Sequence, residues 1–340
     1  MTALGEKLTA RSLAPELPIL RLQRWSRLPP SAFGLLCGLL IVCGMMCPLL
    51  GMTFSNALFN DILGSALFFG ISLGIIAGFS RPVFQGAAQD LKDLCGVIPW
   101  SSDDIQAASL ALARFTKKDV WLAVVLGCVA GAGHSYVLEI QSSSWEFAVP
   151  QFIAIILLWL AMFVTVPPLI MNARLFSSLG QITSPDLLRP SRHAAFGAAA
   201  LRPALLMTSL LCAYALLFLG GENPLDGPVL IGVLGGLIPL IGIIALPLRG
   251  IRRRIREQRR ATLASLDARL DAITEGDIAT ADADALFQLD AILDMRERVA
   301  RAPAWPFDVD ALKRILLFTV LPPLTWAAAA IVEMMIDSLI

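Results

Sequence analysis

Long apolar stretches alternate with polar segments along the whole chain. A helix that crosses the hydrocarbon core of a membrane needs about 20 predominantly apolar residues, and seven stretches reach or approach this length. They are Phe33–Gly51, Ile62–Phe79, Val120–Leu138, Phe147–Met171, Pro203–Leu219, Val229–Leu248 and Ile315–Met335. The pattern therefore predicts an all-α, polytopic membrane protein with seven transmembrane helices.

Composition agrees with this class. Hydrophobic residues make up 56% of the 340 residues and charged residues only 16%, against roughly 25% in an ordinary soluble domain. The mean hydropathy is +0.72. These values exclude a soluble globular domain and a disordered chain. The formal net charge of zero gives no indication of a nucleic-acid partner, and we expect none.

The cations are confined to every second segment between the predicted spans. All 27 lysines and arginines lie in residues 1–32, 80–119, 172–202 and 249–314. Cytoplasmic loops of membrane proteins carry the excess of Lys and Arg. We therefore expect the N-terminus in the cytoplasm and the C-terminus outside, in a plasma membrane of the bacterial inner-membrane type.

The predicted spans divide the chain into four parts. Residues 1–32 form a cytoplasmic N-terminal segment, and residues 33–248 hold six spans as three hairpins. Residues 249–312 form a cytoplasmic helical hairpin, and residues 313–340 hold the seventh span and the outer C-terminus. The three membrane hairpins share one plan, with a proline where each leaves the membrane. They could be an internal repeat or simply the usual topology of membrane hairpins.

The predicted cytoplasmic hairpin is basic where it leaves the membrane. Arg249–Arg260 contains seven arginines in twelve residues, and such clusters attract anionic lipid headgroups; topological anchoring alone is the alternative. Leucine seams at coiled-coil spacing then predict two antiparallel helices separated at Gly276-Asp277. The seams comprise Leu263, Leu266, Leu270 and Ile273 in the first helix, and Leu286, Leu289 and Leu293 in the second, which spans about Thr280–Ala300. The expected partners are the lipid bilayer and either further copies of the chain or a cytoplasmic protein.

Small residues recur at four-residue spacing in several spans. The rows are Gly34 and Gly38; Ala66, Gly70, Gly74 and Gly78; Ala123, Gly127, Gly131 and Ser135; and Gly232 and Gly236. Small residues let helix backbones approach closely in a membrane. Because seven helices offer many internal partners, we interpret the rows as packing faces within the chain rather than as dimer contacts.

Two further segments have helical signals outside the spans. Ser101 precedes acidic residues in the manner of an N-cap, which predicts a short helix over Ile105–Phe115. Residues Ser12–Arg27 mix leucines with arginines and could lie on the inner leaflet or form a poorly ordered tail.

Few groups in the spans could carry chemistry. His134 lies in the third span, five residues before Glu139, and ionisable groups within a membrane are functional candidates. Cys43, Cys47 and their methionine neighbours could in principle bind Cu(I), but we interpret them as ordinary apolar residues of a helix. No nucleophile motif, phosphate-binding loop or metalloprotease helix is present. We therefore predict no catalytic residue, no cofactor and no metal.

The resulting functional prediction is a non-enzymatic transport or channel-type component of a membrane. Hydroxyl and amide side chains in the spans would line its path: Ser65, Ser72, Thr165, Asn172 and Thr325. The alternative is a membrane-embedded sensor or scaffold whose cytoplasmic helical hairpin docks a partner.

Overall fold

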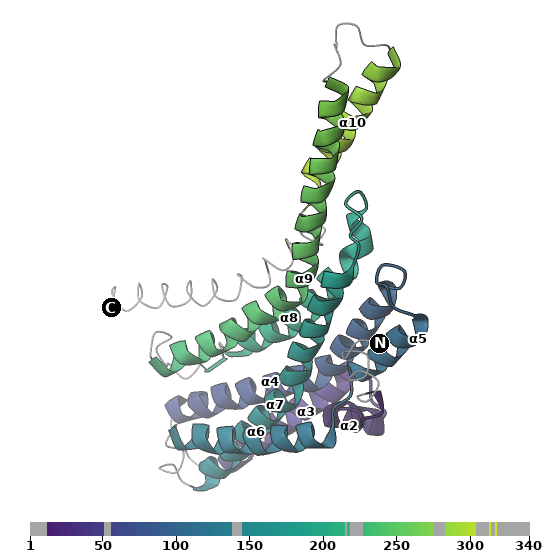
Figure 1. Ribbon diagram of the computed structural model, residues 1–340. Coiled ribbons are helices and arrows are strands. Elements are labelled where there is room, and N and C mark those ends of the chain that lie inside the picture. Colours follow the sequence, from purple (N-terminus) through teal and green to yellow (C-terminus); the bar gives the residue numbers. More distant parts are fainter. Residues whose placement is uncertain are drawn as a thin grey trace, which may run out of the picture.

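The computed structural model describes residues 12–50, 56–137, 145–214, 216–217, 227–274, 283–303, 313 and 317. In these ranges the chain is all-α, and extended pairing is limited to isolated bridges. The helices shown in Figure 1 are α2 (Pro18–Ser26), α3 (Pro30–Met46), η1 (Cys47–Leu49), α4 (Asn56–Asp93), α5 (Ser102–Ala111), α6 (Lys117–Val137), α7 (Trp145–Ile182), η3 (Pro190–His193), α8 (Ala194–Tyr214), α9 (Gly227–Thr274) and α10 (Ala283–Arg301).

Five of the described segments are long and apolar enough to cross a membrane. They are Pro30–Leu49, Ile62–Asp93, Lys117–Val137, Trp145–Ile182 and Pro190–Tyr214, and they contain most of the first five predicted spans. The sixth predicted span falls in the first half of α9. The seventh lies, except for Leu317, outside the described residues, so the count of seven stays a prediction.

Three helices are much longer than a membrane is thick. α4 and α7 each have 38 residues and α9 has 48, which at 1.5 Å per residue is about 57 Å and 72 Å. The hydrocarbon core of a bilayer is only about 30 Å thick. The helices continue through the prolines that mark the predicted membrane exits: Pro82, Pro167, Pro168 and Pro247.

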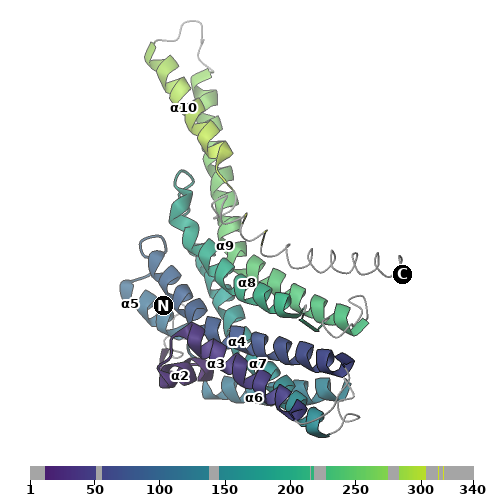
Figure 2. The same ribbon diagram turned by 180° about the vertical axis from the view of Figure 1, so that it is seen from behind.

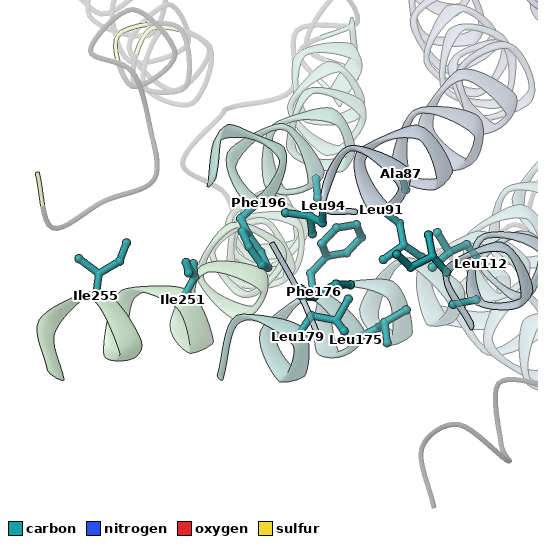
Figure 3. Packing of buried hydrophobic residues seen from close by; sticks show 14 residues of the cluster. Ala87, Leu91, Leu94, Leu112, Leu175, Phe176, Leu179, Phe196, Ile251 and Ile255 are labelled. Atoms are coloured by element: carbon teal, nitrogen blue, oxygen red, sulfur yellow. The ribbon is translucent and has the colours of Figure 1, made fainter. Parts of the chain in front are cut away.

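The extended helices build a packed layer at the end of the bundle that carries the cations. Its core contains residues from α4, α5, α7, α8 and α9, among them Leu91, Leu94, Ile105, Leu112, Phe176, Leu179, Phe196 and Ile251. Phe176 and Phe196 meet edge to face with ring centroids 6.2 Å apart (Figure 3). The Ser101 hydroxyl accepts from the Asp104 N–H at 3.2 Å, which confirms the predicted N-cap. We call this the basic-end layer.

Glycines bring α3 and α4 into backbone contact. A Cβ added at Gly34 would lie 2.5 Å from the Gly74 carbonyl oxygen and 2.8 Å from the Gly78 Cα, and one added at Gly38 would lie 2.7 Å from the Gly70 oxygen. The rows of small residues on α3 and α4 are therefore intrachain packing faces, as the sequence predicts.

The second half of α9 and the antiparallel α10 form an arm that projects from the bundle (Figures 1 and 2). Leu266 and Val299 are buried between the helices, and Arg296 Nε donates to Asp267 Oδ1 at 2.6 Å. Leu286 and Leu293, predicted to lie on the seam, are instead 48% and 47% exposed. The face of α10 that packs on α9 is therefore rotated from the predicted one. Whether the arm lies in the cytoplasm stays a prediction.

Candidate functional site

Buried polar side chains line the interior faces of three helices. α4 contributes Ser72, Ser80 and Asp90, α7 contributes Thr165 and Asn172, and α8 contributes Thr208; all are buried. We call these six residues the inner polar set. On α4, Ser72 and Asp90 are 18 residues apart, which is five whole helical turns, so they lie on the same face, and Ser80 lies about 80° around the helix from them.

The inner polar set ends in an ion pair at the basic-end layer. Arg202 Nη1 on α8 donates to Asp90 Oδ2 on α4, where the Asp90 side chain is 3% exposed and that of Arg202 is 37% exposed. Gly86, one turn before Asp90, lies directly against the Arg202 side chain and leaves no room for a Cβ. This pair ties α4 to α8, and among the described ion pairs it is the one with a buried carboxylate.

Asp90 is not among the candidate residues that the sequence predicts, because the second predicted span ends at Phe79. A signal was present in the sequence: apolar residues continue at helical spacing through Val83, Ala87, Leu91 and Leu94. Following that spacing past Arg81-Pro82 would have extended the helix to Asp90.

Two hydroxyls of the inner polar set have no hydrogen-bond partner among the residues that the structure describes. Within a helix a hydroxyl commonly donates to the carbonyl one turn back, as Ser135 does to Gly131 at 2.9 Å and Thr183 does to Leu179 at 2.8 Å. Ser72 Oγ and Thr165 Oγ1 are buried without such a bond. Because buried polar groups are nearly always paired with protein or water, these hydroxyls are suited to bind water or a polar solute.

The other predicted lining residues have different surroundings. Asn172 Nδ2 donates to the Leu112 carbonyl at 3.4 Å, so its amide contacts the end of α5. Ser65 is half-buried. Thr325 lies outside the described residues. The structure thus brings Ser72, Thr165 and Asn172 into the bundle interior.

α2 covers the basic end of the bundle. Its Leu20, together with Leu17 just before the helix, packs in one cluster with Val164 and Leu169, which flank Thr165 along α7. Gln23 on the same side of α2 is buried, and in the described ranges neither polar atom of its amide has a hydrogen-bond partner.

Two backbone hydrogen bonds, which we call the backbone strap, hold the start of α2 in place. Leu17 N donates to the Ala113 carbonyl at 3.1 Å, and Phe115 N donates to the Pro15 carbonyl at 3.0 Å. Phe115 is buried in the same cluster as Leu17 and Leu20.

His134 lies apart from the inner polar set. Its side chain is exposed on α6, and Trp159 Nε1 on α7 donates to His134 Nδ1 at 3.0 Å. The pair links α6 to α7. Glu139, its predicted neighbour, lies outside the described residues.

In the described ranges, His193 and the cysteines of the first predicted span do not belong to a cluster that could hold a metal ion. His193 is buried, and its Nε2 accepts from the Asp186 N–H at 2.9 Å. Cys43 and Cys47 are exposed while Met45 is buried, so Met45 lies on a different face of α3 from the two cysteines. Within the described part of the chain, no three His, Cys, Asp or Glu residues are grouped as metal ligands would be.

The arginine-rich start of the arm is partly engaged within the protein. Arg254 Nε donates at 3.3 Å to the Thr183 carbonyl just beyond α7, where the helix dipole favours a cation. Arg253 donates to Glu257 at 2.8 Å, and this hydrogen bond holds the pKa of the Glu257 carboxyl below its ordinary value.

Comparison with protein-family models, curated proteins and solved structures finds no match for this chain. The class that the fold itself defines is an all-α protein with five described segments suited to crossing a membrane.

Proposed function

We propose that this chain is a multi-pass integral membrane protein that acts, without catalysing a reaction, as a transport or channel-type component. The basic-end layer and the arm lie in the cytoplasm, the C-terminus lies outside, and seven helices cross a bacterial inner membrane. The alternation of the 27 cations along the sequence supports this orientation.

Exposed aromatic residues support the membrane placement. Trp25 and Trp121 are exposed near the basic end, and Tyr136 and Trp145 are exposed near the other end of the bundle. Trp and Tyr are enriched at the two membrane–water interfaces. Trp121 and Tyr136 are 15 residues or about 22 Å apart along α6, so they lie toward opposite ends of this helix.

The inner polar set is the observation that carries the transport proposal. Burying a hydroxyl that forms no hydrogen bond destabilises a protein by about 1–3 kcal/mol. Two such hydroxyls are therefore unexpected in an apolar bundle unless they contact water or a polar solute. Ser72 and Thr165 are buried in this conformation, so the path is closed. The uncharged hydroxyls favour a small polar solute over a highly charged one. The Asp90–Arg202 ion pair joins α4 to α8 and would hold these two helices together while the path is closed.

A flux assay tests the transport proposal. The purified protein is reconstituted in vesicles, and entry of glycerol, urea, K⁺ and H⁺ is compared with entry into protein-free vesicles. Thr165→Val keeps the shape of the side chain but removes the hydroxyl, and should slow the accepted solute several-fold. Ser209→Ala is the matched control, because Ser209 Oγ donates to its own helix at Leu205. Fluxes equal to those of empty vesicles for all four probes, or equal losses in both variants, would overturn the proposal.

Cysteine labelling tests the orientation separately. In a cysteine-free background, single cysteines at positions 143 and 223 should react with an impermeant reagent on intact cells. Cysteines at positions 102 and 265 should react only after permeabilisation. Reaction at position 265 on intact cells would contradict the proposed topology.

A scaffold function is the second candidate, and one observation favours it. α10 presents Leu286, Phe287, Leu293 and Met295 to solvent, with Phe287 76% exposed. A photo-cross-linking residue at Phe287 should capture one defined cytoplasmic protein, whereas the same residue at the adjacent polar Gln288 should not. Equal labelling at both positions would remove this candidate.

A further inference from the structure

The outward face of α2 is apolar and has no partner in the described part of the chain. Trp25 is 82% exposed and Leu22 is 53% exposed, and at i and i+3 they are neighbours on one helix face. Leu13, five residues before α2 begins, is also exposed. Large apolar side chains grouped in this way mark an interaction surface.

This apolar face cannot turn inward, because the opposite side of α2 is already packed. Leu20 and Gln23 are buried against the bundle, and the backbone strap at Leu17 and Phe115 fixes the start of the helix. Leu22 and Trp25 are therefore held in a defined outward direction.

The position of α2 in the chain indicates what covers the face. α2 ends at Ser26, and the membrane-suited α3 begins at Pro30, so only three residues separate them. Figure 2 shows α2 beside the first turns of α3 at the basic end. A helix joined so closely to a spanning helix lies at the level of the lipid headgroups.

Cations border the apolar face. Arg21 is exposed on α2, and Arg27 is exposed directly after it. Arg24 is also exposed, but it already donates to Glu16 at 2.6 Å. A short helix with Trp and Leu on one side and arginines beside them is typical of elements that lie in the interface of an anionic membrane.

We propose that α2 is a lipid-docking element that inserts Leu22 and Trp25 into the cytoplasmic membrane interface and binds anionic headgroups through Arg21 and Arg27. This proposal rests on the membrane placement under Proposed function. It adds a second basic contact with lipid, distinct from Arg249–Arg260. Leu17 and Leu20 pack in one cluster with Val164 and Leu169, which flank Thr165. Attachment of α2 to lipid would therefore affect the opening of the proposed path near Thr165.

Spin labels on the full-length protein test the insertion. In a cysteine-free background reconstituted in phosphatidylglycerol-containing nanodiscs, labels at positions 22 and 25 should be accessible to oxygen and shielded from a water-soluble nickel reagent. A label at position 21 should show the opposite preference. A label at position 39, on the exposed side of α3, is the reference for lipid exposure.

The reference label separates the two proposals. Water exposure at positions 22 and 25 with lipid exposure at position 39 would overturn the docking of α2 alone. Water exposure at position 39 would overturn the membrane placement itself. Spin–spin broadening at position 25 between labelled copies would show that a second copy covers the face, and would likewise overturn lipid docking.

Lipid composition tests the role of the arginines. Nanodiscs formed from mixed phosphatidylcholine and phosphatidylglycerol should show enrichment of phosphatidylglycerol around the protein. Arg21→Gln and Arg27→Gln should each lower the binding constant for phosphatidylglycerol about fivefold, since a juxtamembrane arginine contributes about 1 kcal/mol. Arg269→Gln, on the exposed surface of the arm, is the control and should change nothing. Equal binding in all three variants would refute headgroup recognition by α2.

Discussion

Replacing Gly34 with alanine tests the packing of α3 on α4. The new Cβ would lie 2.5 Å from the Gly74 oxygen and 2.8 Å from the Gly78 Cα. Both are backbone atoms, so no side chain can rotate away, and ordinary contact would require the helices to separate by roughly 1 Å. Such a gap forfeits a quarter to a half of each pairwise contact energy along the seam. Overpacking typically costs 1–3 kcal/mol, and we expect about 3 kcal/mol for Gly34→Ala because the contact is rigid.

Other glycines on these two helices provide a graded series and a control. The nearest atom to an added Cβ is 2.7 Å away at Gly38, 2.9 Å away at Gly74 and 3.2 Å away at Gly78, whereas at Gly44 nothing lies within 4 Å. The loss of stability should follow this order, and Gly44→Ala should be neutral or stabilising by up to about 1 kcal/mol.

The free energy of unfolding can be measured by titrating SDS into detergent micelles and following tryptophan fluorescence. If Gly34→Ala unfolds at the same SDS fraction as Gly44→Ala, the backbone contact between α3 and α4 is absent and the assignment of the packing face is wrong.

Three further changes test other parts of the structure by the same unfolding measurement or by circular dichroism. Asp90→Asn should destabilise the protein by about 3 kcal/mol, the lower part of the range for breaking a buried ion pair because Arg202 is partly exposed; a loss below about 1 kcal/mol would show that the pair is not formed. Gln23→Leu should stabilise the protein by about 1–3 kcal/mol, because it removes two buried polar atoms without partners, and destabilisation would reveal a hidden partner. The excised peptide 249–303 should be largely unfolded in buffer, since short helices need tertiary support, and should gain helix with anionic vesicles; full helicity in buffer would show an autonomous unit.

Much of the fold follows from local sequence signals. Apolar length alone locates most of α3, α4, α6 and α7, because few other residues can face lipid. The glycine rows identify the faces that pack, since only small residues allow contacts as close as those of Gly34. Ser101 marks the start of α5 because its hydroxyl accepts from the N–H of Asp104.

Apolar spacing favours a helix beyond Pro82, but the packing of the basic-end layer could not be predicted from local signals. Arg81 and Pro82 look like the end of a span, yet α4 continues to Asp93. Burial of Leu91 and Leu94 against α5, α7 and α8 offsets the hydrogen bond lost at the proline. That packing depends on segments far apart in the sequence, and it is what buries Asp90.

The position of α10 on α9 also depends on tertiary contacts. Two patterns compete on the helix: one face carries Leu286 and Leu293, and another carries Leu289 and Val299. The second face packs on α9, where Arg296 meets Asp267 and Val299 is buried. Leucine spacing alone does not distinguish them. Among the predicted lining residues, Ser72 and Thr165 have this interior position because of the crossings between helices, which apolar length does not specify.

Reaction of cysteines placed in the inner polar set tests most directly whether that set is a path. Ser72→Cys and Thr165→Cys, each in a cysteine-free protein reconstituted in vesicles, are exposed to a small water-soluble thiol reagent while solute flux is recorded. Ala154→Cys is the control, because Ala154 is equally buried but packs in the apolar cluster of α3, α4 and α7. The proposed path predicts that the cysteines at 72 and 165 react faster than that at 154 and that their modification blocks flux. Reaction no faster than at position 154, with flux unchanged, would contradict it.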